Sequence, residues 1–327
     1  MINWGIIGCG DVTEVKSGPA FNRVDNSRLL AVMRRDAVKA EDYARRHAVP
    51  RWYSDADALI GDPEVNAIYI ATPPLYHKHY ALRAIAAGKA VYVEKPMAMN
   101  AAEADQMQDA AAKAGVPLSV AHYRRQQPLF LKIRSLLQEK VLGRIHFINL
   151  KLYQPHRANQ SAPPGASWRI DPAVSGGGLF HDLAPHQLDL LLYFFGRPRE
   201  LNGIALNRGG HYEAADTVLC QALFNDGIVF NGLWSFGAEE IHSADVCEIV
   251  GDRGSISFAV FEHQRLLLKT DEREEQFIFE KLPHVQEPMI ACVVRYFSGL
   301  SPNPCTGEDG TIVMEMIDKI TSGGSFR

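Results

Sequence analysis

The chain has 327 residues, of which 46% are hydrophobic and 22% charged, and its formal net charge is -4. This length favours two domains over a single core, and the slightly acidic balance argues against a dedicated surface for nucleic acid or an anionic membrane. The five cysteines are scattered and form no C-x-x-C pair, which fits reduced thiols in the cytoplasm better than disulfides or a zinc site; they are Cys9, Cys220, Cys247, Cys292 and Cys305.

The first residues form a strand pattern, Asn3 to Ile7, in place of the basic region and long apolar segment of an export signal. No apolar run approaches the roughly 20 residues that a membrane helix needs. We therefore expect a cytoplasmic protein without a membrane segment.

Residues 1–121 alternate short apolar runs with helical patterns. The runs are Trp4–Ile7, Leu29–Met33, Ala67–Ala71, Ala90–Val93 and Leu118–Ala121, and the helical candidates are Val12–Val24, Val38–His47, His77–Ala87 and Ala101–Ala114. Strand and helix alternation of this kind predicts a doubly wound parallel sheet with helices on both faces.

The first strand leads directly into Gly8-Cys9-Gly10-Asp11-Val12-Thr13. This is the start of the G-x-G-x-x-G turn of dinucleotide-binding domains, with Thr13 in place of the third glycine or alanine. Glycine lets the backbone touch a pyrophosphate, whose charge then lies at a helix N-terminus. The position of the motif predicts a Rossmann domain over residues 1–121, with Gly8, Cys9, Gly10, Asp11 and Val12 at the cofactor.

The end of the second strand bears on the choice of cofactor. An acidic residue there would bind both ribose hydroxyls, but the sequence reads Met33-Arg34-Arg35-Asp36. Arginine can hold a 2′-phosphate through charge-assisted hydrogen bonds worth roughly 1.5–3 kcal/mol each. We therefore predict NADP(H) in preference to NAD(H). Asp36 is expected to cap the next helix, although a register shift of two residues would make it a ribose ligand and reverse the preference.

The third and fourth strands end in Ala71-Thr72-Pro73-Pro74 and Glu94-Lys95-Pro96. Ligands bind at the carboxyl edge of open parallel sheets, so both segments should lie at the cofactor. A lysine beside a nicotinamide ring can hydrogen-bond a substrate oxygen and stabilise its developing charge. The alternative for Lys95 is a surface lysine paired with an acid. Five residues of this edge are expected to contact the cofactor: Thr72, Pro73, His77, Glu94 and Lys95.

The second half of the chain has a different pattern. After the helical stretch Leu129–Glu139 come strand-like runs separated by turn signals: Ile145–Tyr153, Thr217–Phe224, Ile228–Phe236, Ala244–Val250, Ser255–Val260 and Arg265–Lys269. Consecutive strands predict a mainly antiparallel sheet, hence an α+β domain over residues 122–306. Helices on one face would leave the other face free to meet another subunit. A last helix, over about residues 307–321, is expected to pack back on the first domain.

The chemistry is expected in the stretch from Ser175 to Asp189, which reads S-G-G-G-L-F-H-D-L-A-P-H-Q-L-D. Its glycines suit a turn that something approaches closely. In the helical run that follows, Asp182 and His186 are four residues apart and therefore share a face. A carboxylate can hold an imidazole in one tautomer for proton transfer, although a merely structural buried pair is the alternative. His181 lies about 140° from His186 round the helix, which disfavours a metal site.

Taken together, these motifs resemble the Gfo/Idh/MocA oxidoreductases, a family that includes glucose-fructose oxidoreductase and inositol dehydrogenase. The likeness covers the whole length of the chain. It rests on the glycine turn, Ala71-Thr72-Pro73-Pro74 with His77, Gly88-Lys89 before Glu94-Lys95-Pro96, Arg125 with Pro128, Trp168-Arg169, the Ser175 segment and Gly307-Glu308-Asp309-Gly310. Ala184, Phe180 and Pro185 depart from the usual pattern, and Pro185 allows a helix that begins later than Leu179.

The resemblance implies a Rossmann domain followed by a domain with a large open sheet used for dimer or tetramer assembly. It also implies a catalytic set that falls on Lys95, Asp182 and His186. We expect substrate contacts from these and from His122, Arg125, His156, Trp168 and Arg169. The expected activity is an NAD(P)-dependent oxidoreductase acting on a sugar, cyclitol or related polyol. Two alternatives are a non-catalytic cofactor-binding regulator and a hydrolase or lyase that uses a tightly held nicotinamide transiently.

Overall fold

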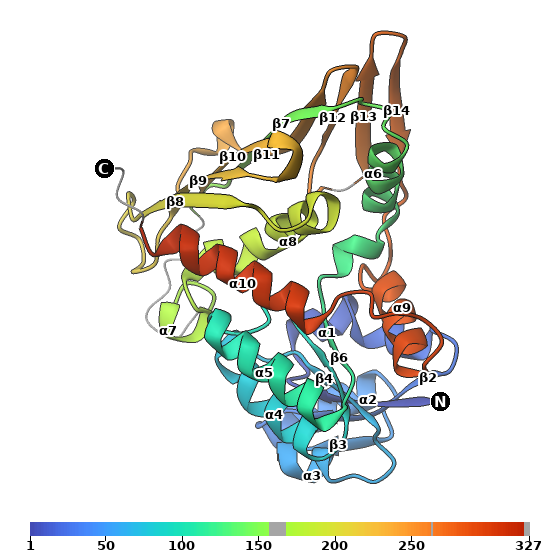
Figure 1. Ribbon diagram of the computed structural model, residues 1–327. Coiled ribbons are helices and arrows are strands. Elements are labelled where there is room, and N and C mark those ends of the chain that lie inside the picture. Colours follow the sequence, from blue (N-terminus) through green and yellow to red (C-terminus); the bar gives the residue numbers. More distant parts are fainter. Residues whose placement is uncertain (157–167, 263, 324–327) are drawn as a thin grey trace. The chain divides into compact units, whose positions relative to one another are not determined.

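A computed structural model of the chain describes residues 1–156, 168–262 and 264–323 (Figure 1). Within these residues the chain forms two compact units. The first unit comprises Met1–Gln127 and Leu282–Met314, and the second comprises Pro128–Lys281 and the residues from Glu315 onward. The expected second domain, residues 122–306, therefore differs from the second unit, because Leu282–Met314 returns to the first unit. The backbone amide of Gln286, for example, donates to the carbonyl oxygen of Lys16 at 3.2 Å.

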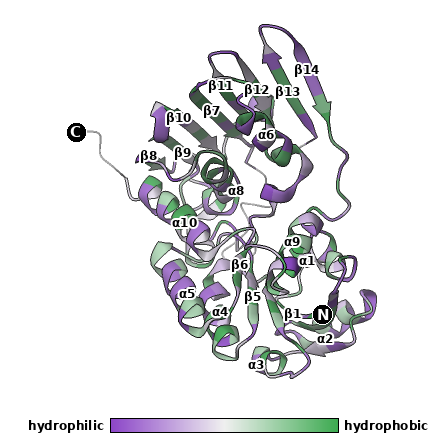
Figure 2. Ribbon diagram, turned by 45° about the vertical axis from the view of Figure 1, so that its right-hand side comes forward, coloured by the Kyte–Doolittle hydropathy of each residue, from purple (hydrophilic) through white to green (hydrophobic). Residues whose placement is uncertain are grey.

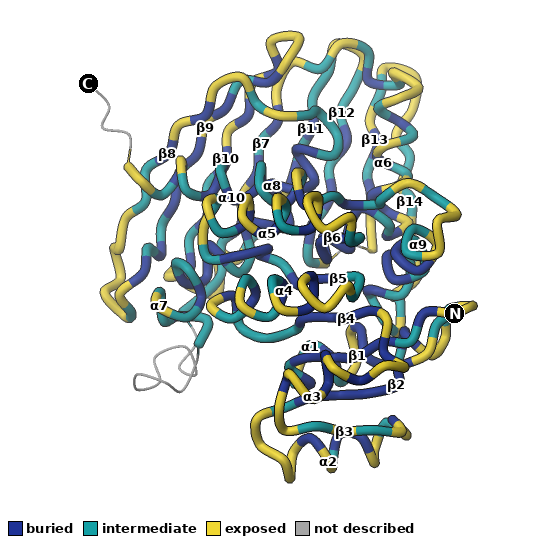
Figure 3. Tube along the Cα trace, turned by 60° about the horizontal axis from the view of Figure 1, so that its bottom comes forward, coloured by how far each residue is buried: buried dark blue, intermediate teal, exposed yellow. Residues whose placement is uncertain are grey.

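The first unit is built on a parallel sheet, as predicted. In the described residues this sheet has six strands in the order β3-β2-β1-β4-β5-β6, all paired in parallel. The strands are β1 (Ile2–Ile7), β2 (Ser27–Met33), β3 (Arg51–Tyr53), β4 (Ala67–Ile70), β5 (Ala90–Val93) and β6 (Leu118–Val120). Figure 3 shows the central strands buried along most of their length, as expected for a sheet covered on both faces. Strand β3 was not predicted, because Arg51-Trp52-Tyr53 lacks the run of aliphatic residues that marks the other strands.

Helices and short turns connect these strands. They are α1 (Asp11–Val15), η1 (Gly18–Asn22), α2 (Ala37–Arg46), α3 (Ala56–Ile60), η2 (Pro74–Tyr76), α4 (His77–Ala86), α5 (Ala101–Ala114), η3 (Tyr123–Gln126) and α9 (Glu287–Phe297), with the first part of α10 (Gly307–Thr321). Asp36 caps α2, as predicted, by accepting a hydrogen bond from the amide of Lys39 at 3.1 Å. Helix α10 begins against this unit, since a Cβ on Gly310 would lie 2.6 Å from the sulfur of Met97.

The single helix expected over Val12–Val24 is instead two short pieces, α1 and η1. Pro19 cannot donate an amide hydrogen bond, which favours a break in the helix before it. Gly18 is required at the break, because a Cβ there would lie 2.2 Å from the carbonyl oxygen of Thr13 and 2.3 Å from the hydroxyl of Tyr43. That hydroxyl donates to the same carbonyl at 2.8 Å. The sequence pattern missed this contact because Tyr43 comes from α2, about thirty residues away.

The second unit is built on a mixed, mostly antiparallel sheet, as predicted. Its eight strands in the described part of the chain have the order β14-β13-β12-β11-β7-β10-β9-β8, and among these the pair of β7 with β10 is parallel. The strands are β7 (Ile145–Tyr153), β8 (Glu200–Leu206), β9 (Thr217–Leu223), β10 (Val229–Ser235), β11 (Ala244–Gly251), β12 (Gly254–Phe258), β13 (Arg265–Thr270) and β14 (Glu274–Ile278). Strands β8 and β14 were not predicted; β8 contains Asn202 and Gly203, and β14 begins with two acidic residues, all unfavourable in strands.

The helices of the second unit are α6 (Pro128–Gln138), α7 (Pro172–Ser175), α8 (Gly178–Phe195), the short turns η5 (Asn225–Gly227) and η6 (Glu240–His242), and the end of α10. Figure 2 shows hydrophilic and hydrophobic residues alternating along the strands of the sheet. Helix α8 packs on the hydrophobic face: Phe180 meets Trp234 of β10 edge-to-face at 5.2 Å, and the indole of Trp234 donates to Gln187 at 2.6 Å. This packing fixes which face of α8 is turned away from the sheet.

Helix α8 runs without a break through Pro185, so the later start that this proline allowed does not occur. A proline inside a helix costs about 3 kcal/mol. Most residues of α8 are buried, including Leu179, Phe180 and Leu188, and burying one such side chain contributes about 1.5–3 kcal/mol. Packing therefore offsets the lost hydrogen bond. In the described residues, no helix combines the length and apolar character needed to cross a membrane.

Candidate active site

The glycine turn after β1 is held in a conformation that only glycine adopts readily. Gly8 has φ +94°, and a Cβ there would lie 2.9 Å from the backbone nitrogen of Thr72. The amides of Gly8 and Cys9 both donate to the carbonyl oxygen of Met33, at 2.9 and 3.2 Å. The turn therefore joins the carboxyl ends of three neighbouring strands: β1, β2 and β4.

The open backbone at Gly10 and the hydroxyl of Thr72 fit the phosphates of a dinucleotide. Gly10 caps α1 without a side-chain hydrogen bond, and the nearest atom to a Cβ added at Gly10 would be 3.9 Å away. The backbone is thus open to close approach by a ligand. The buried Thr72 hydroxyl has no hydrogen-bond partner within the residues described. Asp11 is exposed and Val12 half-buried beside the turn. Burial raises the pKa of the Cys9 thiol to about 11, so this side chain is neutral at pH 7.

Two arginines follow β2 at the same edge of the sheet. The Arg34 guanidinium donates to the carbonyl oxygen of Cys9 at 3.3 Å, which places its charge beside the glycine turn. Arg35 is exposed, and its guanidinium carbon lies 5.2 Å from the ring centroid of Tyr76 in η2. The carboxylate of Asp36 is engaged with Lys39 as the cap of α2. Strand β2 ends at Met33, as the sequence predicted, so Asp36 is the third residue after the strand.

His77 and Glu94 support this edge from inside. The two ring nitrogens of the fully buried His77 lie 2.9 Å from the oxygen of Pro96 and 2.7 Å from that of Thr72. Burial lowers the pKa of His77. The ring therefore joins the loop after β4, which includes the half-buried Pro73, to the loop after β5. A neutral imidazole donates from one ring nitrogen, so one of these contacts is a hydrogen bond. A direct contact of the His77 ring with a cofactor, expected from the sequence, would require the ring to leave both oxygens.

Glu94 accepts three hydrogen bonds in the interior of the first unit. Its Oε1 accepts from the hydroxyl of Tyr69 at 2.5 Å and from the side-chain amide of Gln286 at 2.6 Å, and its Oε2 accepts from the backbone amide of Lys95 at 3.1 Å. Glu94 is 5% exposed, and such a buried carboxylate needs donors of this kind. The side chain of Glu94 is therefore engaged within the protein, while Lys95, half-buried, follows at the carboxyl end of β5.

His122 and Arg125, expected at the substrate, are both buried just after β6. An Nη1 of Arg125 donates to the carboxylate of Asp309 at 3.1 Å. Burial by itself would raise the pKa of Asp309, but the charge of Arg125 and hydrogen bonds from Thr306 offset this and lower it. Part of the Arg125 guanidinium is thus used to hold the start of α10. Thr306 and Asp309 form a reciprocal capping box at this helix start. Their spacing of three residues is the sequence signal from which the start of α10 could have been predicted.

In the second unit, α8 carries Asp182 and His186 one turn apart on one face, as predicted. The carboxylate of Asp182 lies 3.4 Å from Nε of Arg169, and the Arg169 guanidinium carbon lies 4.6 Å from the ring centroid of Trp168. His186 is 4% exposed, with its ring 5.7 Å from that of Phe261. The structure therefore brings Trp168, Arg169 and Asp182 together, a grouping that the spacing in the sequence did not show.

The glycines before α8 allow close packing inside the second unit. A Cβ on Gly177 would lie 2.1 Å from the ring of His181, and one on Gly178, which has φ +74°, would lie 2.5 Å from Cβ of Ala214. The close approach predicted for this turn is therefore made by the protein itself. Burial lowers the pKa of His181 to about 4, so it is neutral at pH 7.

The remaining expected site residues are distributed between the units. His156, three residues after the end of β7, stacks on His211 with ring centroids 3.8 Å apart. Lys95 belongs to the first unit, whereas Asp182 and His186 belong to the second. The expected catalytic set is therefore divided between the two units.

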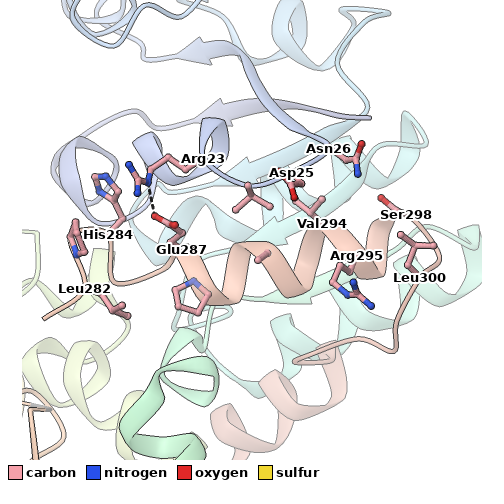
Figure 4. Close-up of a pocket in the computed structure, with 14 residues that line it drawn as sticks. Arg23, Asp25, Asn26, Leu282, His284, Glu287, Val294, Arg295, Ser298 and Leu300 are labelled. Carbon is pink, nitrogen blue, oxygen red and sulfur yellow. Dashed lines mark hydrogen bonds and ion pairs between the residues drawn. The ribbon is translucent and has the colours of Figure 1, made fainter. Parts of the chain in front are cut away.

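A cavity of about 540 Å³ lies in the first unit at the opposite edge of the parallel sheet, between the turn before β2 and α9 (Figure 4). Its lining includes Asn26, which precedes β2, and its wall carries an ion pair of 2.8 Å between Arg23 and Glu287. The glycine turn and Lys95 follow strand ends, whereas this cavity adjoins a strand start. It is therefore separate from the expected cofactor edge.

Comparison with known sequences identifies relatives over the whole chain. Residues 2–122 match an oxidoreductase family with an NAD-binding Rossmann fold, and residues 130–257 match the GFO/IDH/MocA C-terminal domain. Oxidoreductase P35 of Formosa agariphila is 44% identical over 319 residues, covering 97% of each chain. The 1,5-anhydro-D-fructose reductase of Ensifer adhaerens is 27% identical over 316 residues, covering 95% of this chain and 92% of the relative.

Solved structures share the fold at low identity. The aldose-aldose oxidoreductase of Caulobacter crescentus superposes with a TM-score of 0.85 at 22% identity, covering 98% of this chain and 96% of that one. A levoglucosan dehydrogenase in complex with NADH and levoglucosan superposes with a TM-score of 0.84 at 22% identity, with the same coverage. The two-part architecture is therefore common to these proteins.

The pair of Arg125 and Asp309 predicts a pH dependence of stability. Because the pKa of Asp309 is lowered in the folded state, its contribution is fully present above the unfolded pKa, about 4, and is lost as the pH falls through the folded value. We expect Asp309→Asn to lower the free energy of unfolding at pH 7 by about 1–3 kcal/mol. The difference from wild type should shrink below about pH 4. Urea unfolding across this pH range measures both effects.

Asp109→Asn is the matched control, because Asp109 pairs with Lys113 on the exposed surface of α5. An exposed pair of this kind contributes at most about 1 kcal/mol. Equal losses in the two variants at pH 7, or a loss in Asp309→Asn that does not vary with pH, would contradict the assignment.

Proposed function

The chain belongs to the Gfo/Idh/MocA oxidoreductases, and from this membership we propose that it transfers a hydride between NADP(H) and a carbon of a sugar, cyclitol or related polyol. In the oxidative direction a secondary alcohol becomes a ketone: the carbon loses a hydride and the hydroxyl loses a proton. The main support is the position of Lys95 at the same strand edge as the glycine turn, directly after a carboxylate that is fully engaged inside the protein.

We assign the proton transfer to residues of this chain. His186 takes the hydroxyl proton, and Asp182, one turn earlier on α8, orients and stabilises the resulting imidazolium. The ammonium of Lys95 stabilises the negative charge that develops on the substrate oxygen. The nicotinamide, when bound, accepts or returns the hydride. The paired position of Asp182 and His186 on one helix face supports these roles.

The proposed substrate class follows from the relatives and from the side chains around Asp182. Two relatives are named for 1,5-anhydro-D-fructose and levoglucosan, both anhydro sugars. Trp168 offers an aromatic face to the apolar side of a sugar ring, and Arg169 offers hydrogen-bond donors to its hydroxyls. We also retain His122 and His156 as proposed substrate contacts. Arg125 would contribute only with the part of its guanidinium that does not bond Asp309.

We propose NADP(H) as the preferred cofactor because of the charge at the end of β2. Arg34 lies against the glycine turn, and Arg35 is exposed over the ring of Tyr76, while the next residue, Asp36, is engaged in capping α2. A 2′-phosphate would meet two guanidinium groups there, whereas the ribose hydroxyls of NAD(H) would find no acidic partner directly after the strand.

Substitution of the proposed catalytic residues should abolish turnover while cofactor still binds. We expect Lys95→Ala and His186→Ala each to lower kcat by at least about a hundredfold, the usual contribution of a positioned acid or base. The measurement is the change in nicotinamide absorbance with NADP⁺ and a panel of levoglucosan, 1,5-anhydrosorbitol, myo-inositol and aldoses, and with NADPH and 1,5-anhydro-D-fructose.

Lys113→Ala and His242→Ala are the matched controls, since both side chains are exposed in their own units. Near wild-type turnover in Lys95→Ala or His186→Ala would refute the assigned roles. Absence of any net cofactor conversion by the wild type across the panel would refute the proposed reaction.

The cofactor preference has its own test. We expect Arg34→Ala and Arg35→Ala each to weaken NADPH binding by about ten- to a hundredfold, the equivalent of one charge-assisted hydrogen bond, with little effect on NADH. Fluorescence titration of both cofactors at one ionic strength measures the ratio. Arg45→Ala, an exposed arginine of α2 paired with Asp42, is the control. Tighter binding of NADH than of NADPH by the wild type would overturn the preference.

We further propose that two copies associate through the face of the eight-stranded sheet that α8 does not cover. Phe147, Val229 and Val246 on this face are 39%, 50% and 43% exposed. In register, one row joins Val229, Phe147 and Val250, another joins Leu233, Lys151 and Val246, and the row between them is polar, with Asn231, Asn149 and Glu248. The first row is apolar, the middle row is polar, and the third row carries Lys151 between two apolar side chains. A two-fold rotation that keeps the middle row in place brings apolar side chains of the first row against those of the third, which favours an isologous dimer.

A charge in an apolar row should weaken such a dimer. We expect Phe147→Lys to shift the protein toward the monomer in sedimentation equilibrium, because pairing across a two-fold axis would bury the new ammonium group without an acidic partner and would bring it toward Lys151 of the other copy. Ile241→Glu is the control: Ile241 is 87% exposed in η6, outside the sheet. An unchanged dimer in Phe147→Lys, or a monomeric wild type at micromolar concentration, would rule out this interface.

A further inference from the structure

Residues 284–287 of the first unit contact both α1, the helix that follows the glycine turn, and Glu94, the residue that precedes Lys95. At the start of this segment the Nδ1 of His284 lies 2.6 Å from the carbonyl oxygen of Val15, and the amide of Gln286 donates to that of Lys16 at 3.2 Å. Both acceptors lie at the end of α1, the helix that follows the glycine turn. The segment is therefore attached to the C-terminal end of the helix that follows the glycine turn.

The outer and inner sides of this segment have different surroundings. His284 and Glu287 face the cavity drawn in Figure 4, where Glu287 pairs with Arg23. Gln286 is 0% exposed and turns inward, and its side-chain nitrogen donates to Oε1 of Glu94 at 2.6 Å. The side-chain amide of Gln286 therefore contacts the residue that precedes Lys95.

The Glu94 carboxylate links Gln286 to the backbone of Lys95 by accepting a hydrogen bond from each. Its Oε1 is shared by Gln286 and Tyr69, and its Oε2 accepts from the amide of Lys95 at 3.1 Å. A carboxylate is planar, so two donors on one oxygen determine where the other oxygen points. Without the Gln286 donor, Oε1 of Glu94 would still accept from Tyr69. The Glu94 carboxylate would lose one of the hydrogen bonds that fix its side-chain torsion angles.

We infer that Gln286 is a positioning residue for Lys95: by holding Glu94, it sets where the Lys95 backbone, and with it the ammonium group, lies at the strand edge. This inference rests on the proposed role of Lys95. Gln286 bonds Glu94, and its effect on Lys95 passes through that carboxylate. The physical basis is that a displacement of about 1 Å at a reacting group can cost a hundredfold in rate.

The experiment uses Gln286→Met, which keeps the length of the side chain but removes the amide donor. Gln127→Met is the matched control, since Gln127 is also 0% exposed and donates one hydrogen bond, at 3.1 Å, to Val285 in the same segment without touching Glu94. We expect Gln286→Met to lower kcat by about tenfold with little change in NADPH affinity. Gln127→Met should keep wild-type kcat. The substrate is the panel member that the wild type turns over fastest.

A double-mutant cycle separates positioning from general stabilisation. If Gln286 acts through Lys95, then Gln286→Met should cause no further loss of the residual turnover in a Lys95→Ala background. A tenfold loss in both backgrounds would overturn the inference, as would wild-type kcat in Gln286→Met. If the Met variant does not fold, as judged by thermal unfolding, Gln286→Asn replaces it, because the shorter amide cannot reach Glu94; wild-type kcat in that variant also overturns the inference.

The two proposals fail in different ways. Wild-type turnover in Lys95→Ala would overturn the role of Lys95 and this inference together. A large loss in Lys95→Ala with full activity in Gln286→Met would leave the proposed function intact and overturn the inference alone.

Discussion

The buried carboxylate of Glu94 is the interaction on which the organisation of the first unit depends most directly. It accepts from Tyr69 of β4, from Gln286 before α9 and from the amide of Lys95 after β5. A buried charge is tolerated only when such donors surround it, and removal of one donor leaves a cost of several kcal/mol. The return of residues 282–314 to the first unit is therefore tied to the residue that precedes Lys95.

In the second unit, the mostly buried helix α8 carries the polar residues expected in the site. Helix α8 packs Phe180 and Gln187 against Trp234 of the sheet. Its opposite side carries Asp182 and His186, with Arg169 beside the carboxylate. Glycines at its start make room for His181 and for Ala214. The helix is thus positioned by apolar packing on one side and carries its titratable pair on the other, a common way to hold functional groups rigidly.

The family pattern is modified in this chain in ways that the structure explains. Thr13 replaces the third glycine of the nucleotide turn, and its hydroxyl donates to the carbonyl of Gly10 at 2.8 Å. Close packing between α1 and α2 is achieved instead at Gly18, where Tyr43 reaches the carbonyl of Thr13. The two arginines after β2 replace the acid that many NAD-binding domains carry there, and this difference underlies the proposed preference for NADP(H).

Local patterns in the sequence determined most of the fold: the alternation of runs and helices predicted the parallel sheet, the later strand runs predicted the antiparallel one, and the spacing of Asp182 and His186 predicted their common helix face. These features depend on neighbours within about four residues, which a sequence pattern records. The tertiary structure alone decided the contacts of Gln286 with Glu94, of Arg125 with Asp309 and of Tyr43 with Thr13, because each joins residues between 30 and 192 positions apart. It also decided that α8 continues through Pro185, since the burial that offsets the lost hydrogen bond comes from strands distant in the chain.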